Sequence, residues 1–361
     1  MAGNVFGKIL TLSSFGESHG PAIGGMLDGM PPGISFSEQE LRLEMERRRP
    51  GQSELSSPRD EKDPVQLLSG VKDGKTTGLP IGFIIENQDA RPSDYQHLRT
   101  SFRPSHADFT YLKKYGTLPT SGGGRASARE TAVRVAAGYF AKQLLRANGV
   151  VLKAYVHSVG HLALPENFTI EAQLDQKEND LRCPDSNLSE KMGQLIDSVR
   201  KKGDSLGGCI QCEIFNCPAG LGEPVFDKLQ ADLAKAMLSI NACKAFEYGS
   251  GFRGTQMRGS QHNDPFETED GQNAKTTTNF SGGIQGGISN GMPIYFKLGF
   301  KPVSTINIKQ TTLNTSLEKT EIEGKGRHDP CVVPRAVPIV EAMAALVLAD
   351  HLLRNKLYSD K

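Results

Sequence analysis

Residues 24–34 read Gly-Gly-Met-Leu-Asp-Gly-Met-Pro-Pro-Gly-Ile, and the chain carries a second version of this stretch. Residues 207–221 again begin with Gly-Gly and a pair of apolar or small residues, and Pro-Ala-Gly-Leu follows before a predicted helix. Further matches continue in the same order, between residues 69–81 and 281–294, and then between Arg125-Ala126 and Arg335-Ala336. The Gly-Gly pair, the Pro-x-Gly turn, the third segment and the Arg-Ala pair are thus four matches in one order. They argue for an internal pseudo-twofold of strand–helix–strand units, with chance similarity of glycine-rich turns as the alternative.

The apolar pattern around these matches predicts both strands and helices. Strand-like runs lie near residues 4–12, 22–28, 80–86, 150–159, 208–216 and 293–299. Ser37 and Glu40 form a capping-box pattern for a helix that should stop at Pro50. Further helices are expected near residues 127–148, 189–202, 224–240 and 334–357, the last as an apolar core or interface helix. Two long loops, near 88–120 and 254–290, are expected to be functional or mobile.

Composition limits the classes of function. The 361 residues are 37% apolar and 23% charged, which is typical of a folded, soluble protein. A net charge of +1 gives no overall field that attracts nucleic acid or an acidic membrane. No signal peptide is expected, and no segment approaches the roughly 20 apolar residues of a membrane span. Of six scattered cysteines only Cys209 and Cys212 lie close together, so we expect buried thiols in a reducing cytoplasm and no metal site.

Three of the eight histidines, His19, His106 and His328, lie in turn-forming sequence beside a charge or a hydroxyl. Glycine and proline place such side chains on loops, where a scaffold presents them to a ligand. Histidine exchanges protons near neutral pH, and the flanking arginines indicate an anionic partner. This pattern predicts an enzyme with a phosphate or carboxylate substrate. At the third position Asp329, rather than His328, could be the working group.

Arginine is concentrated in a few segments. A glycine run at 122–124 leads into a predicted helix with Ser127 and Arg129 beside it, which offers backbone amides to an anion. A flexible loop with a serine cap is the alternative. Arg47-Arg48-Arg49 ends a helix and is equally consistent with a solvated basic end. The loop near 88–120 contains Arg91, His97, Arg99 and Arg103, a composition suited to a lid over an anion.

Five motifs together resemble the chorismate synthase family over residues 3–355, in the order in which that family has them. They are residues 16–20 (Gly-Glu-Ser-His-Gly), 47–51 (Arg-Arg-Arg-Pro-Gly), 103–108 (Arg-Pro-Ser-His-Ala-Asp), 124–130 (Gly-Arg-Ala-Ser-Ala-Arg-Glu) and 326–331 (Gly-Arg-His-Asp-Pro-Cys). The resemblance implies conversion of 5-enolpyruvylshikimate 3-phosphate to chorismate and phosphate. This is the last common step of the shikimate pathway to aromatic amino acids, a 1,4-elimination that needs reduced FMN without net redox change.

The same resemblance implies an architecture. It is an α+β fold, a β-α-β sandwich with helices layered between antiparallel sheets, in one domain over residues 1–361. It also implies a homotetramer. No segment is long enough for a flavin reductase module, so reduced FMN is expected from outside, with NADPH as a candidate external reductant.

Site residues follow from the resemblance, position by position. His19 would protonate the departing phosphate, His106 would protonate the reduced flavin, and Asp329 would help relay the ring proton. FMN contacts are implied for Arg125, Ala126, Ser127, Asn241, Ala242, Gly286, Lys301, Pro302, Val303, Ser304, Thr305 and Arg327. Substrate contacts are implied for Arg48, Arg49, Arg103 and Arg129.

Two departures from the family pattern stand out. Glu54 replaces a second arginine found in many relatives, which weakens the nicotinamide or phosphate contact implied there, and we expect Arg59 to supply the charge. Ala126 replaces a serine found in many relatives.

Two other classes of protein stay open at this point. A flavin oxidoreductase acting on a phosphorylated sugar acid would also need arginines, whereas a nucleic-acid-binding protein lacks the expected interleaved aromatics and basic balance.

Overall fold

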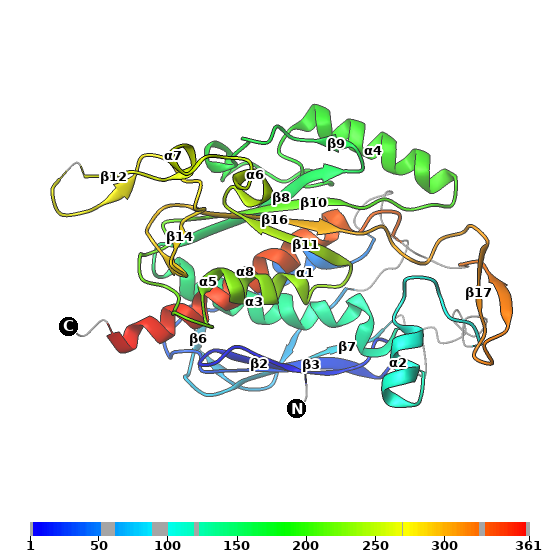
Figure 1. The fold of residues 1–361 in the computed structure, drawn as a ribbon. Helices are drawn as coiled ribbons and strands as arrows, with labels where there is room; N and C mark the ends of the chain where they lie inside the picture. The colour runs from blue at the N-terminus through cyan, green and yellow to red at the C-terminus, as the bar shows by residue number, and fades with distance from the viewer. Residues whose placement is uncertain are drawn as a thin grey trace.

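Two antiparallel sheets form the frame of the molecule (Figure 1). The computed structural model describes residues 3–51, 62–88, 100–118, 123–268, 270–324 and 329–358. Within these ranges the first five-stranded sheet has the order β1 (Val5–Phe6), β2 (Thr11–Gly16), β3 (Ala22–Asp28), β7 (Ile81–Glu86) and β4 (Gln66–Leu67). The second has the order β11 (Cys243–Tyr248), β16 (Ile294–Phe300), β10 (Gly208–Phe215), β8 (Val151–Val159) and β9 (Leu162–Ala163).

Four helices lie between the two sheets in Figure 1: α1 (Glu38–Arg48), α3 (Thr131–Arg146), α5 (Leu229–Leu238) and α8 (Val333–Asn355). By length and composition α8 could cross a membrane, but its apolar window is entirely buried inside the protein. The prediction of a core helix is therefore confirmed. Helix α4 (Ser186–Lys201) lies on the outer side of the second sheet, and α2 (Asp108–Tyr115) lies at one end of the molecule.

Short hairpins and turns complete the described chain. The hairpins are β5 (Val71–Lys72) with β6 (Lys75–Thr76), β12 (Phe266–Glu267) with β13 (Lys275–Thr276), β14 (Ile284–Gln285) with β15 (Ile288–Ser289), and β17 (Gln310–Leu313) with β18 (Lys319–Ile322). The short helical turns are η2 (Gly124–Ala126), η3 (Ala128–Glu130), η4 (Glu171–Gln173), α6 (Gly251–Gly254), α7 (Gly259–His262) and η5 (Lys356–Tyr358).

The mixed helix and antiparallel-sheet class is confirmed, but several predicted boundaries are wrong. The expected strand over residues 4–12 is interrupted by a turn, because Gly7 has a φ of +91° and a Cβ there would lie 1.9 Å from the Leu10 carbonyl oxygen. The expected helices over 127–148 and 224–240 begin only at Thr131 and Leu229. Residues 108–115 of the expected loop form α2, whereas residues 89–99 and 119–120 of that loop lie outside the described chain.

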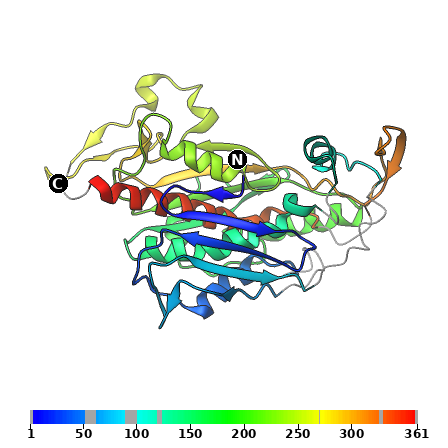
Figure 2. The same cartoon turned by 90° about the horizontal axis from the view of Figure 1, so that it is seen from below.

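Helices α3 and α8 pack closely because small residues face each other. Gly138 of α3 lies against Ala342 of α8, and a Cβ built on Gly138 would lie 2.4 Å from the Ala342 Cβ. Nearly every residue of both helices is buried. The two helices form the centre of the core, and their N-terminal ends point toward the end of the molecule where α2 lies (Figures 1 and 2).

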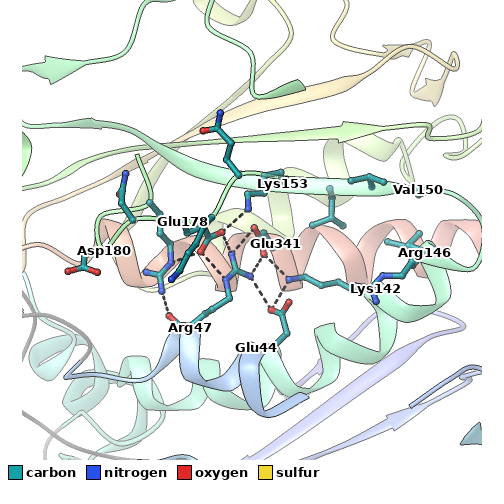
Figure 3. Close-up of a pocket in the computed structure, with 16 residues that line it drawn as sticks. Glu44, Arg47, Lys142, Arg146, Val150, Lys153, Glu178, Asp180 and Glu341 are labelled. Atoms are coloured by element: carbon teal, nitrogen blue, oxygen red, sulfur yellow. Dashed lines mark hydrogen bonds and ion pairs between the residues drawn. The ribbon is translucent and has the colours of Figure 1, made fainter. Parts of the chain in front are cut away.

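A group of ion pairs around the buried Glu341 carboxylate joins this helix layer to the second sheet (Figure 3). Glu341 of α8 accepts hydrogen bonds from Arg47 of α1 at 2.6 Å, from Lys142 of α3 at 2.7 Å and from the Ala154 amide of β8 at 3.1 Å. Arg47 also pairs with Glu178 at 2.7 Å. Burial would raise the pKa of Glu341, but the charges of Arg47 and Lys142 and their hydrogen bonds lower it well below its ordinary value. The cluster therefore fixes the C-terminal end of α1.

Substitution of Gly138 tests the close approach of α3 and α8. We expect Gly138→Ala to lower the free energy of unfolding by about 1–3 kcal/mol, because the new methyl group forces the helices apart. The better helix propensity of alanine offsets about 1 kcal/mol of that loss. Urea denaturation measures the change. Ala342→Gly in the same chain should recover part of it, and a Gly138→Ala protein as stable as the wild type would contradict the packing.

Substitution of Glu341 tests the buried ion cluster. Glu341→Gln removes the carboxylate that Arg47 and Lys142 share, which is only 3% exposed, while both cations keep their pairs with Glu44. We therefore expect a loss of about 1.5–3 kcal/mol in the free energy of unfolding near neutral pH, the contribution of a hydrogen bond to a charged group. The matched control is Glu44→Gln, because Glu44 contacts the same two cations but is about one fifth exposed, at 21%. The control should lose much less.

The pH dependence of the same variant checks its cause. The pKa of Glu341 is lowered in the folded protein, so its stabilisation is present above the unfolded pKa of about 4.3 and is lost as the pH falls through the folded value. The stability difference between wild type and Glu341→Gln should therefore shrink on acidification. A difference that stays constant down to strongly acidic pH would exclude the carboxylate charge as its origin.

Candidate active site

His19 lies on the turn that joins β2 to β3, at the ends of two interior strands of the first sheet. The Asn87 side chain, just after β7, donates to the main-chain oxygens of Glu17 at 2.9 Å and Gly20 at 2.8 Å. Ser18 is 4% exposed, and its hydroxyl has no hydrogen-bond partner among the described residues. The turn is thus held rigidly from outside, and it carries a buried polar group that a ligand could satisfy.

His106 lies on the turn before α2, next to a buried carboxylate. Its Nδ1 is 2.8 Å from Oδ1 of Asp108, the first residue of the helix. Arg103 donates to the same carboxylate from Nε at 2.8 Å and from Nη2 at 2.6 Å, and its main-chain N–H donates to it at 3.1 Å. Burial would raise the pKa of Asp108, but the hydrogen bonds and charges of Arg103 and His106 lower it well below its ordinary value.

Asp329 lies just before α8 and is paired with Arg335 in the first turns of that helix. Arg335 also donates from Nε to the Arg48 main-chain oxygen at 3.4 Å. The carboxylate therefore lies near the C-terminal end of α1, where the arginine run is. Arg327 and His328, which precede Asp329, lie outside the described residues.

Two of the predicted substrate arginines share one carboxylate that sequence reasoning missed. Arg48 Nη1 donates to Asp63 Oδ2 at 3.1 Å, and Arg129 pairs with the other oxygen of Asp63. All three side chains are nearly inaccessible, at 2%, 3% and 0% exposure. A lone aspartate carries no distinctive sequence signal, so only the fold identifies Asp63.

The remaining donors of these arginines reach neighbouring loops. Arg129 donates to the Asn87 amide oxygen at 2.8 Å. It is therefore bonded directly to the residue that holds the His19 turn. Arg48 donates to the Ala128 carbonyl at 2.5 Å and to the Thr131 hydroxyl at 3.2 Å. Asn87, the second residue that sequence reasoning missed, therefore joins the His19 turn to the arginine pair.

Several predicted flavin contacts lie together near the N-terminal end of α3. The Asn241 amide nitrogen donates to the Ala126 carbonyl at 2.9 Å, while its buried amide oxygen has no partner in the described part of the chain. Ser127 caps the turn η3 by accepting from the Arg129 amide at 3.3 Å. The Lys301 amide donates to the carbonyl of Ala242 at 3.0 Å.

Lys301 and Arg125 are cations without a carboxylate partner among the described residues. The Lys301 ammonium group donates to Ser304 Oγ at 2.7 Å and to the hydroxyl and carbonyl of Ser105 at 3.0 Å each. Arg125 donates to Ser14 Oγ at 2.7 Å and to the Gly16 carbonyl at 3.1 Å. Burial and the nearby Lys244 charge lower the pKa of Lys301.

These contacts connect the three loops that carry the predicted catalytic residues. Ser105, beside His106, is bonded to Lys301. Arg125, whose Nη1 donates to the Gly16 carbonyl at the start of the His19 turn, is bonded there at 3.1 Å. The 301–305 segment reaches the third loop through Ser205 and Leu206. Ser205 Oγ donates to the carbonyl of Val303 at 2.9 Å, and the next amide, that of Leu206, donates to the carbonyl of Pro330, beside Asp329, at 2.8 Å.

Pro302 and Thr305 belong to the same 301–305 segment. Pro302 precedes the bonded Val303, and the Thr305 side chain lies against Gly324. Glu54, Arg59, Arg91, His97, Arg99 and Gly122 lie outside the described residues. The proposed compensation by Arg59 and the lid composition therefore stay predictions.

Gly286 is the one predicted flavin contact among the described residues that lies away from the others. It is in the turn between β14 and β15, next to the N-terminal end of α5, because the Leu229 amide donates to the Gly287 carbonyl at 2.8 Å. Asn241 follows the opposite end of that helix, which spans about 15 Å at 1.5 Å per residue. A Cβ on Gly286 would meet no atom within 4 Å, so the turn presents open backbone.

Five of the six cysteines are buried, as the sequence predicts, whereas Cys209 is half-buried. Cys212, Cys217 and Cys331 are buried, burial raises the pKa of each thiol, and all six cysteines are unlinked. Cys209 and Cys212 lie on β10, on which residues three apart face opposite sides. Within the described ranges no group of three histidine, cysteine or acidic side chains could hold a metal ion.

Comparison with known proteins identifies the family of this chain. The family model for chorismate synthase matches residues 10–353. The chorismate synthase of Christiangramia forsetii is 56% identical over 356 residues, covering 99% of both chains, and that of Flavobacterium psychrophilum is 55% identical over 365 aligned positions, covering 100% of both. A solved crystal structure of chorismate synthase superposes with a TM-score of 0.74 at 31% identity, covering 97% of this chain and 93% of that one. The chain belongs to the chorismate synthase family.

Proposed function

We propose that this protein converts 5-enolpyruvylshikimate 3-phosphate to chorismate and phosphate by 1,4-elimination, with reduced FMN as cofactor. The observation that carries the proposal is the linkage of the loops of His19, His106 and Asp329 through arginine and lysine contacts at one end of the molecule. A substrate with one phosphate and two carboxylates needs such a concentration of cations. A chain with a net charge of +1 offers that concentration only locally.

The described residues fit a bound flavin mononucleotide. Lys301 and Arg125 are bonded only to neutral oxygens within the described chain, so they can each accept a phosphate as an ionic partner. The buried Asn241 amide oxygen can accept a hydrogen bond from a flavin N–H or a ribityl hydroxyl. When bound, reduced FMN would supply electron density to the substrate transiently and recover it, which explains a requirement for flavin without net redox change.

The chain's own residues divide the remaining work. Arg103 and Arg129, each fixed by a buried carboxylate, would hold the anionic groups of the substrate in one orientation. His19 would donate a proton to the departing phosphate from its rigid turn. His106 and Asp329 would hold and move the other protons within the site, each transfer contributing about 10²–10⁴-fold in rate.

We also propose that the protein is a homotetramer. The outer face of the first sheet, visible in Figure 2, presents Phe15 at 53% exposure and Met26 at 45%, with Ile84 beside them through the pairing of β3 and β7. An exposed apolar face of this kind is typical of a protein–protein contact. The position of Gly286, away from the other flavin contacts of its own chain, also supports an assembly in which neighbouring chains complete a site.

We propose that residues 1–361 form a single domain, a β-α-β sandwich with an internal pseudo-twofold. Support comes from matching neighbours: β2, β3 and β7 are adjacent in the first sheet, as β8, β10 and β16 are in the second. In each sheet the central strand carries the repeated Gly-Gly pair or begins within it. The repeated Arg-Ala pair lies at the start of each long helix: Arg125-Ala126 precedes α3, and Arg335-Ala336 lies in the first turn of α8.

We also propose that the reduced cofactor comes from outside the chain. We propose that a separate reductase or the surroundings supply it, with NADPH as the external reductant, in a reducing cytoplasm. Glu54 stands where many relatives have an arginine, so the chain lacks that positive charge for a direct nicotinamide contact.

Anaerobic turnover tests the function directly. With the enolpyruvyl substrate and reduced FMN, we expect chorismate and phosphate in equal amounts while the flavin ends the reaction still reduced. Without reduced FMN neither product should form. Stoichiometric oxidation of the flavin would instead identify an oxidoreductase, and the absence of chorismate under reducing conditions would overturn the proposal.

Loss of the Lys301 charge tests the cofactor site. We expect Lys301→Met to weaken FMN binding by about 10–150-fold, because a charge-assisted hydrogen bond contributes about 1.5–3 kcal/mol. Fluorescence titration of oxidised FMN in the presence of substrate measures the affinity. The control is Lys191→Met in α4, an exposed lysine on the outer side of the second sheet. Equal affinities for both variants would place the flavin phosphate elsewhere.

A further inference from the structure

We propose that Asp108 is the positioning residue of His106: its carboxylate holds the imidazole with Nδ1–H toward the helix and leaves Nε2 as the nitrogen that exchanges protons in the site. The inference rests on the proposed function for the role of His106. The tautomer itself is a property of the folded chain and is measurable whether or not that function is correct.

The geometry of the pair carries the proposal. The distance from His106 Nδ1 to Asp108 Oδ1 is 2.8 Å, within the range of a charge-assisted hydrogen bond. An ionised carboxylate only accepts hydrogen bonds, so Nδ1 must be the donor. Because one ring nitrogen then carries its proton toward Asp108, Nε2 points away from it.

The carboxylate cannot turn away from the ring, because Arg103 holds it on its other side. The Arg103 guanidinium reaches one carboxylate oxygen through Nε and the other through Nη2, and the Arg103 main-chain N–H adds a third donor. The Asp108 and Arg103 side chains are each 8% exposed. The single shared oxygen, Oδ1, therefore couples the position of the imidazole to that of the guanidinium.

The surroundings keep Asp108 ionised. Although burial opposes the charge, the contacts with Arg103 and His106 lower the pKa of the carboxyl group well below its ordinary value. Among the described residues, the charged groups that contact the turn are Arg103 and, through its hydrogen bonds to Ser105, Lys301. Both are cations, so neither promotes protonation of Asp108.

The chain contains a matched pair that serves as an internal control. Asp232 of α5 accepts from His351 of α8, with 2.9 Å between Oδ2 and Nε2, and the His351 side chain is 1% exposed. His351 lies about 27 Å along α8 from the end that carries Asp329, at 1.5 Å per residue. This pair has the same chemistry, with the ring nitrogens exchanged, at the far end of the helix from the proposed site.

Nitrogen NMR of histidine-labelled protein, at a pH where the rings are neutral, tests the proposal. We expect wild-type His106 to show a protonated Nδ1 and an unprotonated Nε2, with the signal assigned through His106→Gln. In Asp108→Asn that preference should be reduced or reversed. An amide NH₂ group only donates hydrogen bonds, and at either carboxylate position it would lie against an N–H donor of Arg103. Asp232→Asn should leave the His106 signal unchanged.

The wild-type spectrum alone can overturn the inference. If neutral His106 carries its proton on Nε2, Asp108 does not fix the ring, whatever happens to the variants. This outcome keeps the test decisive even if Asp108→Asn fails to fold. If the wild type forms no chorismate, the proposed function fails, but the tautomer result stands by itself.

Kinetics separate the effect on His106 from the effect on Arg103. A positioning role predicts that Asp108→Asn lowers kcat by about 10²-fold, the lower range for a lost general acid or base, with a smaller change in KM. Arg103→Lys should instead raise KM more than it lowers kcat. If Asp108→Asn only raises KM, the carboxylate acts through Arg103 alone and the proposal is wrong. Asp108→Glu, which keeps the charge, should recover part of kcat.

Discussion

The rest of the structure depends on one buried carboxylate, Asp63, placed between the guanidinium groups of Arg48 and Arg129. Two such cations cannot be buried side by side without a counter-charge, because desolvation and mutual repulsion both oppose it. Asp63 supplies that charge. Through it the C-terminal end of α1, the turn before α3 and the Asn87 side chain become one unit, and Asn87 in turn holds the His19 turn. The proposed anion-binding site is thus built on a fixed frame.

The same principle recurs around the site. Asp108 holds Arg103 and His106, Arg335 holds Asp329, and Glu341 holds Arg47 one residue before Arg48. In each case a carboxylate and a guanidinium group lock a loop or a helix end, so that few side chains have to reorganise when a ligand binds. Lys301 and Arg125, which lack such partners among the described residues, are then available for ligand charge. This explains how a chain of nearly zero net charge can serve a polyanionic substrate.

Much of this was predictable from the sequence, and the remainder has a physical reason. The turns of His19 and His106 were predicted because glycine and proline act locally, and α1 was predicted because Ser37 caps it. Asp63 and Asn87 were missed because they contact partners 66 and 70 residues away in the chain. Helix α2 was missed because its tyrosines and lysines also suit a loop. The separation of Gly286 from Asn241 depends on the orientation of α5, which no local pattern encodes.

The most direct test of the account is a crystal structure of the assembled protein with oxidised FMN and the enolpyruvyl substrate bound. The account predicts that both ligands lie in one pocket in contact with His19, His106 and Asp329, with the flavin phosphate near Lys301 or Arg125 and the substrate anions near Arg103 and Arg129. Ligands bound in a pocket that excludes two or more of the three catalytic candidates, even with neighbouring chains included, would contradict it.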